Sequence, residues 1–261
     1  MFAPALPSTS GACFPPVAYL LAEPRRYGFR VREAVPRAAY ARVRLDPVIG
    51  AAISDAYMAA PMRDERAFSA YAAFCRETVR QYHFLVGRVE FGGLGVAVRF
   101  VDDDPYPDAE AMVDDLRQRR LKVWASAATG NPHPYLSDSE NDMFRAVHDA
   151  FGHAASGRGF DPHGEEAAWL KHSTMYSPLA RRALTTETRG QNCAQTFHYR
   201  GGRFPEQKAV LLPVPFSDPR SVRIEDISVT APRSTVRSPD AGPAPLGAQA
   251  RLHRSDRGAT G

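Results

Sequence analysis

The sequence lacks long hydrophobic runs, is poor in cysteine and contains only three lysines. No stretch approaches 18 consecutive apolar residues, which excludes a membrane-spanning helix. The first residues show no basic region followed by an apolar run, so we expect no secretory leader. Cys13, Cys75 and Cys193 are far apart and form no CxxC pair. We therefore expect neither a disulfide framework nor a cysteine zinc site, and a cytoplasmic location.

The charge pattern does not favour nucleic acid or a membrane surface as a partner. The formal net charge is +4, but much of the excess lies in residues 231–261, where five arginines face two aspartates. The rest of the chain is nearly neutral, which is not typical of a phosphate-binding face. No GxGxxG, phosphate-binding loop, GxSxG or HExxH motif occurs, so nucleotide-binding, serine hydrolase and zincin classes have no support.

Length and patterning predict one mainly helical domain of the α+β class. The chain has 261 residues, of which 44% are hydrophobic and 24% charged, as in average globular proteins. We expect an irregular segment over 1–36, a folded catalytic domain over 37–215 and a Pro- and Arg-rich, largely disordered tail over 216–261. Apolar periodicity predicts helices from 46, over 62–82, over 108–120 and, with breaks, over 138–195, a strand pair over 86–101 with a hairpin turn at 92–95, and a strand over 121–125.

The densest chemistry lies in His148-Asp149-Ala150-Phe151-Gly152-His153. In a straight α-helix two residues five apart differ by roughly 140° and do not share a face. Both rings reach one metal ion only if the helix ends or bulges between them, and Gly152 suits such a break. Asp149 could orient His148 through its second ring nitrogen or bond a metal-bound water. The pair predicts a metal site.

A third ligand candidate stands on a later helix that ends at Glu187-Thr188-Arg189-Gly190. Two histidines and one carboxylate hold iron(II) on one face and leave positions for dioxygen and substrate. We expect His148, His153 and Glu187 to be the ligands, and Arg189 to hold a substrate carboxylate.

These segments resemble the bacterial aromatic amino acid hydroxylases. His148-Asp149-Ala150-Phe151-Gly152-His153 is similar to their His-Asp-x-Phe-Gly-His iron motif, and Leu179–Glu187 is similar to the helix that carries their glutamate ligand. A third match, from Leu116 to Val123, is similar to their helix-to-strand entry before the iron loop, so the likeness covers about residues 116–190. It implies the hydroxylase fold and a mononuclear iron(II) monooxygenase acting with dioxygen on a small, aromatic or amino-acid-like molecule. The reductant stays open between a pterin and another donor, and no signal sets the oligomeric state.

Other assignments remain open at this point. Glu165 or Glu166 could replace Glu187 or hold a second metal ion in a dinuclear oxygenase, with His172 a weaker candidate. If the site is closed by four ligands, the metal braces the fold only. The dipeptide His148-Asp149 also fits an HD-type hydrolase, in which His133 or His83 and Asp161 would complete the site. Aromatic side chains nearby in sequence are candidate pocket walls, namely Phe144, Phe151, Trp169 and Tyr176.

Overall fold

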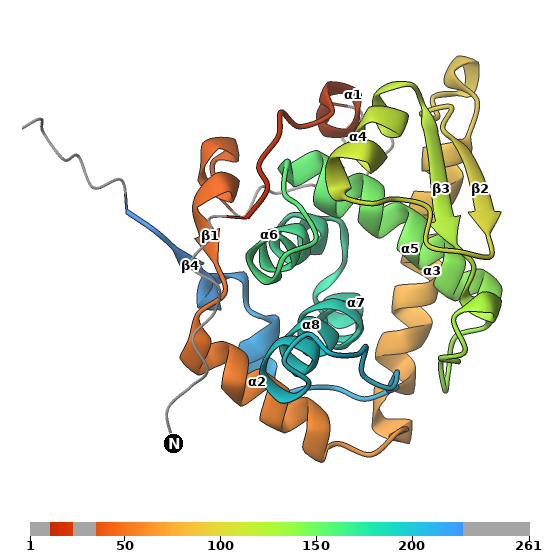
Figure 1. Cartoon of the computed structure of the whole chain (residues 1–261). Helices are drawn as coiled ribbons and strands as arrows, with labels where there is room; N and C mark the ends of the chain where they lie inside the picture. The colour runs from red at the N-terminus through yellow and green to blue at the C-terminus, as the bar shows by residue number, and fades with distance from the viewer. Residues whose placement is uncertain (1–10, 23–34, 227–261) are drawn as a thin grey trace, which may run out of the picture. The chain divides into compact units, whose positions relative to one another are not determined.

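The structure is a computed structural model that describes residues 11–22 and 35–226. It consists mainly of helices, with a central group surrounded by others (Figure 1). Helices α6 and α7 lie in the middle, with α2, α3 and α5 around them. The bounds of the helices are α1 Ala18–Ala22, α2 Pro47–Ala59, α3 Phe68–Val86, α4 Ala109–Arg117, α5 Asp138–His148, α6 Pro162–His172, α7 Pro178–Thr185 and α8 Gln191–Cys193. Together with short strands they confirm the predicted α+β, mainly α class.

Side-chain caps start the helices close to where the sequence predicts them. Asp46 accepts hydrogen bonds from the backbone N–H groups of Val48 and Ile49 and begins α2. Ser137 and Glu140 form a reciprocal capping box at the start of α5. These caps satisfy N–H groups that a helix leaves without partners at its first turn.

Three π-helical turns interrupt the long helical run over 138–198. They span Asp149–Ala154, Thr186–Gly190 and Ala194–His198. The first continues α5, and the other two continue α7 and α8. In such turns the backbone bonds close over five residues instead of four, so the side chains after each turn are shifted around the helix axis.

The strands form two small pairs. β2 (Ala97–Val101) runs parallel to β3 (Arg120–Trp124), with Ala97 opposite Arg120 and Val101 opposite Trp124. The predicted hairpin over 86–101 is therefore wrong: its first part is the end of α3 and a short 3-10 turn at Val89–Phe91, and β2 pairs through the crossover helix α4. β1 (Val43–Arg44) pairs antiparallel with β4 (Arg223–Ile224).

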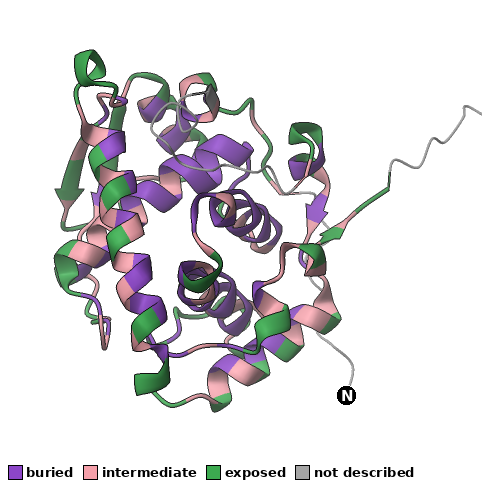
Figure 2. Cartoon of the chain, turned by 180° about the vertical axis from the view of Figure 1, so that it is seen from behind, coloured by how far each residue is buried: buried purple, intermediate pink, exposed green. Residues whose placement is uncertain are grey.

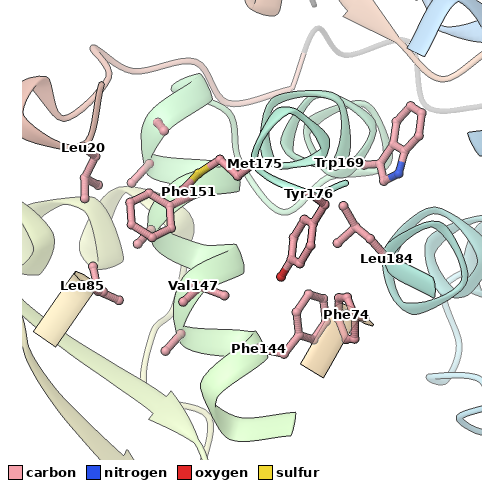
Figure 3. Packing of buried hydrophobic residues seen from close by; sticks show 14 of the residues in the cluster. Leu20, Phe74, Leu85, Phe144, Val147, Phe151, Trp169, Met175, Tyr176 and Leu184 are labelled. Atoms are coloured by element: carbon pink, nitrogen blue, oxygen red, sulfur yellow. The ribbon is translucent and has the colours of Figure 1, made fainter. Parts of the chain in front are cut away.

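The core lies where the central helices meet α3 and α5. Helix α6 is buried on nearly all sides, and α7 is buried on one face (Figure 2). Phe74, Phe144 and Tyr176 pack together there, with ring centroids of Phe74 and Tyr176 5.3 Å apart (Figure 3). Trp169 and Leu184 extend this cluster. Such burial contributes roughly 1.5–3 kcal/mol for each large side chain, so the surrounding helices are held firmly.

The folded unit is wider than the predicted domain over 37–215. Val17 and Leu20, in the segment expected to be irregular, are buried in the core around α1. At the other end β4 pairs with β1, and the compact unit extends to Asp226. The remaining part of the predicted tail, 227–261, lies outside the described residues. Within the described ranges, no helix is long and apolar enough to cross a membrane.

Candidate metal centre

The first π turn brings His148 and His153 to one face. His148 ends α5, and the turn Asp149–Ala154 carries the chain to His153 with one extra residue. The two ring centroids are 5.0 Å apart. Two histidines five residues apart in the sequence can share one metal ion only if the helix bulges between them, and this π turn is such a bulge. At Gly152 a Cβ atom would lie only 3.1 Å from Nδ1 of His148, so the missing side chain leaves room for the ring.

Helix α6 contributes the third ligand group. Asp161 caps this helix by accepting from the N–H groups of His163 and Gly164, which places Glu165 in the first turn. Its Oε1 lies 3.3 Å from Nε2 of His153, and its Oε2 lies 3.6 Å from Nε2 of His148. Among the described residues, His148, His153 and Glu165 form the group whose potential ligand atoms all lie within 4.8 Å of one another.

A chain of hydrogen bonds behind His148 determines which ring nitrogen faces the site. The amide Nε2 of Gln81 donates to the carbonyl of Met175 at 3.4 Å, so its Oε1 accepts from Nε2 of His172 at 2.8 Å. Nδ1 of His172 then accepts from Nδ1 of His148 at 3.3 Å. Nε2 of His148 therefore carries a lone pair. This atom is buried and has no hydrogen-bond partner among the described residues, as expected of a metal ligand.

His153 has the same orientation for a different reason. Its Nδ1 donates to the backbone carbonyl of Arg158 at 3.1 Å. That bond leaves Nε2 directed at Glu165. Two imidazole Nε2 atoms and one carboxylate thus converge, and this donor set suits iron(II) and also zinc.

The pKa shifts show how strongly these groups act on one another. Burial lowers the pKa of His148. Burial also disfavours the charged form of His153, but the Glu165 carboxylate outweighs it and raises the pKa of His153 to about 9. In turn, burial favours protonated Glu165, yet the charge of His153 and the nearby side chain of His148 lower the pKa of Glu165. The ligand group therefore requires a positive charge, which a divalent ion can supply in place of the proton.

Glu187, the expected third ligand, is bound elsewhere. Its Oε1 accepts from the Tyr71 hydroxyl and from Nε2 of His133 at 3.0 Å, and its Oε2 accepts from Nε2 of Gln191 at 3.0 Å. It lies outside the group formed by His148, His153 and Glu165. In this structure Glu165, and not Glu187, completes the candidate ligand group, and Glu187 on the second π turn, Thr186–Gly190, contacts Tyr71 of α3 and His133 of the loop before α5.

Arg189 and Glu166 are paired with each other. The guanidinium donates from Nε to both carboxylate oxygens of Glu166, at 3.0 and 2.8 Å, and it lies 4.4 Å from the ring centroid of Trp169. Both charged side chains are 1% exposed. Arg189 is therefore a structural residue here and does not hold a substrate carboxylate, contrary to expectation. For the same reason Glu166 does not complete a four-ligand site.

A cavity of about 420 Å³ adjoins the ligand group. His148, His153, Glu165 and Glu187 all line it, and its aromatic walls are Trp124, Phe144, Phe160 and Phe204. Of the four aromatic residues expected as walls, only Phe144 is among the lining residues, because Phe151, Trp169 and Tyr176 belong to the core.

Asp149 also lines this cavity, but it does not orient His148 as expected. His172 occupies that position. Burial, opposed by His153 and reinforced by Glu165, raises the pKa of Asp149 to about 7.

Several contributors were not recognisable in the sequence. Gln81 and Tyr71 lie on α3, about 70 to 80 residues before the ligands, in an ordinary amphipathic pattern. The sequence suggests His172 only as a weak ligand candidate. It lies seven residues after Glu165, at the other end of α6, where it contacts His148 from behind. The fully buried character of α6 was the one available signal, because polar residues in a central helix need a partner or a ligand.

Comparisons with family models, with curated proteins and with solved structures each found no match for this chain.

Proposed function

We propose that this protein is a mononuclear non-haem iron(II)-dependent oxygenase of the monooxygenase or hydroxylase type. Its ligands would be His148, His153 and Glu165, and its substrate a small molecule bound in the adjoining cavity. The observation that carries the proposal is the convergence of two imidazole Nε2 atoms and one carboxylate at the wall of an open cavity. The motif resemblance of residues 116–190 supports the same class and the hydroxylase fold.

The ligand set fits a catalytic metal better than a structural one. A structural site is closed by four protein ligands, whereas a catalytic site keeps positions open. Glu166, the residue that could close the site, is engaged by Arg189. When bound, iron(II) with three protein ligands supplies dioxygen activation at its remaining positions. The reductant would be a pterin or another small electron donor.

An HD-type hydrolase is less well supported by the same geometry. Asp149 is not in the ligand group, and His133 is hydrogen-bonded to Glu187. Asp161 is used as the cap of α6, and His83 is exposed on α3. A dinuclear site would need a further carboxylate ligand, but Asp149 lies outside the group of converging ligand atoms and Glu166 is engaged by Arg189.

The chain's own residues have three tasks in this proposal. His172 and the Arg158 carbonyl hold the two histidine rings so that their Nε2 atoms face the ion. The aromatic side chains Trp124, Phe144, Phe160 and Phe204 would contact an apolar part of the substrate. Asp149, beside the ligands, can accept or donate a proton at the cavity surface.

Metal analysis of protein purified without oxygen tests the proposal. We expect about one iron per chain and an electron paramagnetic resonance signal after nitric oxide is added, which reports an open position. Replacing His148, His153 or Glu165 by alanine should remove the iron, whereas Glu187→Gln should retain it. Two metal ions per chain, or zinc without a nitrosyl signal in iron-loaded protein, would exclude a mononuclear oxygenase.

A further inference from the structure

Among the described residues, the buried carboxylate of Glu187 has no lysine or arginine at salt-bridge distance, and Arg145 acts on it only from farther away. Glu187 is 5% exposed, and it has three hydrogen-bond donors: Tyr71, His133 and Gln191. His133 contacts it at salt-bridge distance, but Nδ1 of that ring accepts from the backbone N–H groups of Tyr135 and Leu136. The ring is therefore neutral and donates only through Nε2. Glu187 is held in position, yet its charge is not balanced.

The cations of the surrounding elements are already engaged. Arg189 is bound by Glu166. The ammonium group of Lys208 donates to the carbonyls of Tyr57, Met58 and Ala60. A buried charge without a counter-charge is strongly destabilising. Proteins retain buried charges without a counter-charge at functional sites, where a bound ligand supplies the opposite charge. The side of Glu187 that faces the cavity is therefore a binding position for a ligand.

The charged side chains that line the cavity also favour a positively charged ligand. Its carboxyl groups are Asp104, Asp149, Glu165 and Glu187, whereas its basic side chains among the described residues are Arg145 and the two histidines of the candidate ligand group. Asp149, Asp142 and Glu187 all act on the charge of Arg145. Burial lowers the pKa of Arg145, and these carboxylates compensate only part of that effect. The carboxyl groups still outnumber the guanidinium in the cavity lining. Such a cavity favours a cationic ligand over an anionic one.

We propose that Glu187 binds the ammonium group of the substrate, and that the substrate is a small primary amine with an apolar, preferably aromatic, body and no carboxylate. This inference rests on the proposed function, because Glu187 lines the cavity next to His148 and His153. The ammonium group replaces the missing counter-charge and donates to the carboxylate. The aromatic walls Phe144, Trp124 and Phe204 accommodate the body, and their ring faces attract the cation.

Binding of matched amines and alcohols to metal-loaded protein tests this proposal. The probes are 2-phenylethylamine with 2-phenylethanol, and butylamine with butanol, measured by calorimetry on protein loaded with zinc(II). We expect at least one amine to bind tenfold or more tightly than its alcohol. Glu187→Gln keeps the shape of the side chain and one acceptor oxygen but removes the charge, and it should abolish that preference while the metal content stays unchanged. Glu90→Gln, an exposed glutamate in the turn before β2, is the matched control and should keep the preference.

Several results would overturn the proposal. Equal binding of amines and alcohols, or binding of neither, would show that Glu187 does not select a cation. Tighter binding of phenylalanine than of 2-phenylethylamine would show that Arg145 recognises a carboxylate. Loss of metal in Glu187→Gln would make Glu187 a ligand instead. Each of these results would leave the iron content of the unmodified protein and its nitrosyl signal unchanged. Failure of the proposed oxygenase function would instead appear as the absence of one or both.

Discussion

The Nδ1 atoms of His148 and His172 lie 3.3 Å apart, and the hydrogen between them belongs to His148. The amide of Gln81 determines this, because its Oε1 accepts from the other nitrogen of His172. A residue on α3 thereby sets the tautomer of a candidate metal ligand on α5. Bonds of this kind typically change metal affinity tenfold to a hundredfold when they are removed.

We therefore expect Gln81→Met to weaken metal binding by about tenfold to a hundredfold. Methionine has a similar length but a much weaker acceptor, so the hydrogen on His172 loses its preferred position. Thr78→Val is the matched control: Thr78 is buried one turn away on α3, and its hydroxyl is hydrogen-bonded to Tyr176 at 2.7 Å. Both variants should lower thermal stability, but only Gln81→Met should change the metal dissociation constant measured by competition with a chelator. Equal affinity in both variants would contradict the tautomer argument.

Gly152→Ala should destabilise the protein although Gly152 lies in a helical segment. In an unconstrained helix the change from glycine to alanine stabilises by roughly 1 kcal/mol. Here the new methyl group would meet Nδ1 and Cε1 of His148 at 3.1 and 3.2 Å, and Cβ of Ala168 at 3.3 Å. Overpacking of this kind costs about 1–3 kcal/mol. Urea unfolding of the metal-free protein gives the sign directly, and a stabilised variant would show that the π turn has room to spare.

Arg189→Met should lower the free energy of unfolding by about 3–5 kcal/mol, because Glu166 is left buried and charged without its partner. The double variant Glu166→Leu with Arg189→Met should be markedly more stable than the single one, since apolar side chains of similar size replace the pair. Equilibrium unfolding of the three proteins measures both differences. A single variant that is as stable as the parent would show that the ion pair is open to water.

The cysteines should differ sharply in their reaction with iodoacetamide. Burial, with a contribution from Glu140, raises the pKa of Cys75 to about 12, and burial raises the pKa of Cys193 well above its usual range. Because the thiolate is the reactive form, both groups should stay unmodified between pH 7 and pH 9, and Cys75 should gain reactivity only as the pH approaches 12. Cys13 is exposed and should react first. Peptide mapping of folded and unfolded protein gives the comparison, and fast labelling of Cys75 at pH 7 would contradict it.

Local signals in the sequence predicted most of the helices, and they predicted the two histidines as a pair that needs a bulge. Asp46 before an apolar repeat marks the start of α2, and the spacing of five between His148 and His153 required the departure from a straight helix that the π turn provides. Nothing local marked the parallel pairing of β2 with β3, because strands joined through a helix meet only in the folded chain.

The carboxylate of the candidate ligand group was harder to assign from the sequence, because three glutamates lie in largely buried helical segments, namely Glu165, Glu166 and Glu187. Adjacent residues on a helix differ by about 100°, and periodicity of a fully buried helix does not show which direction faces a ligand. Only the partners separate the three: Arg189 engages Glu166, and Tyr71 with His133 engages Glu187. Those partners come from distant parts of the chain.

The order of the two neighbouring glutamates in α6 has a consequence for assembly of the fold. If α6 rotated by one residue so that Glu166 faced the histidines, Glu165 would turn by the same 100° to the position of Gly164, away from Arg189, and the Glu166–Arg189 ion pair would be lost. The ring of Trp169, stacked on the Arg189 guanidinium from the same helix, would then leave its place. The Glu166–Arg189 ion pair and the stacked ring of Trp169 therefore stabilise one rotation of α6 about its own axis. That rotation places Glu165 beside His148 and His153.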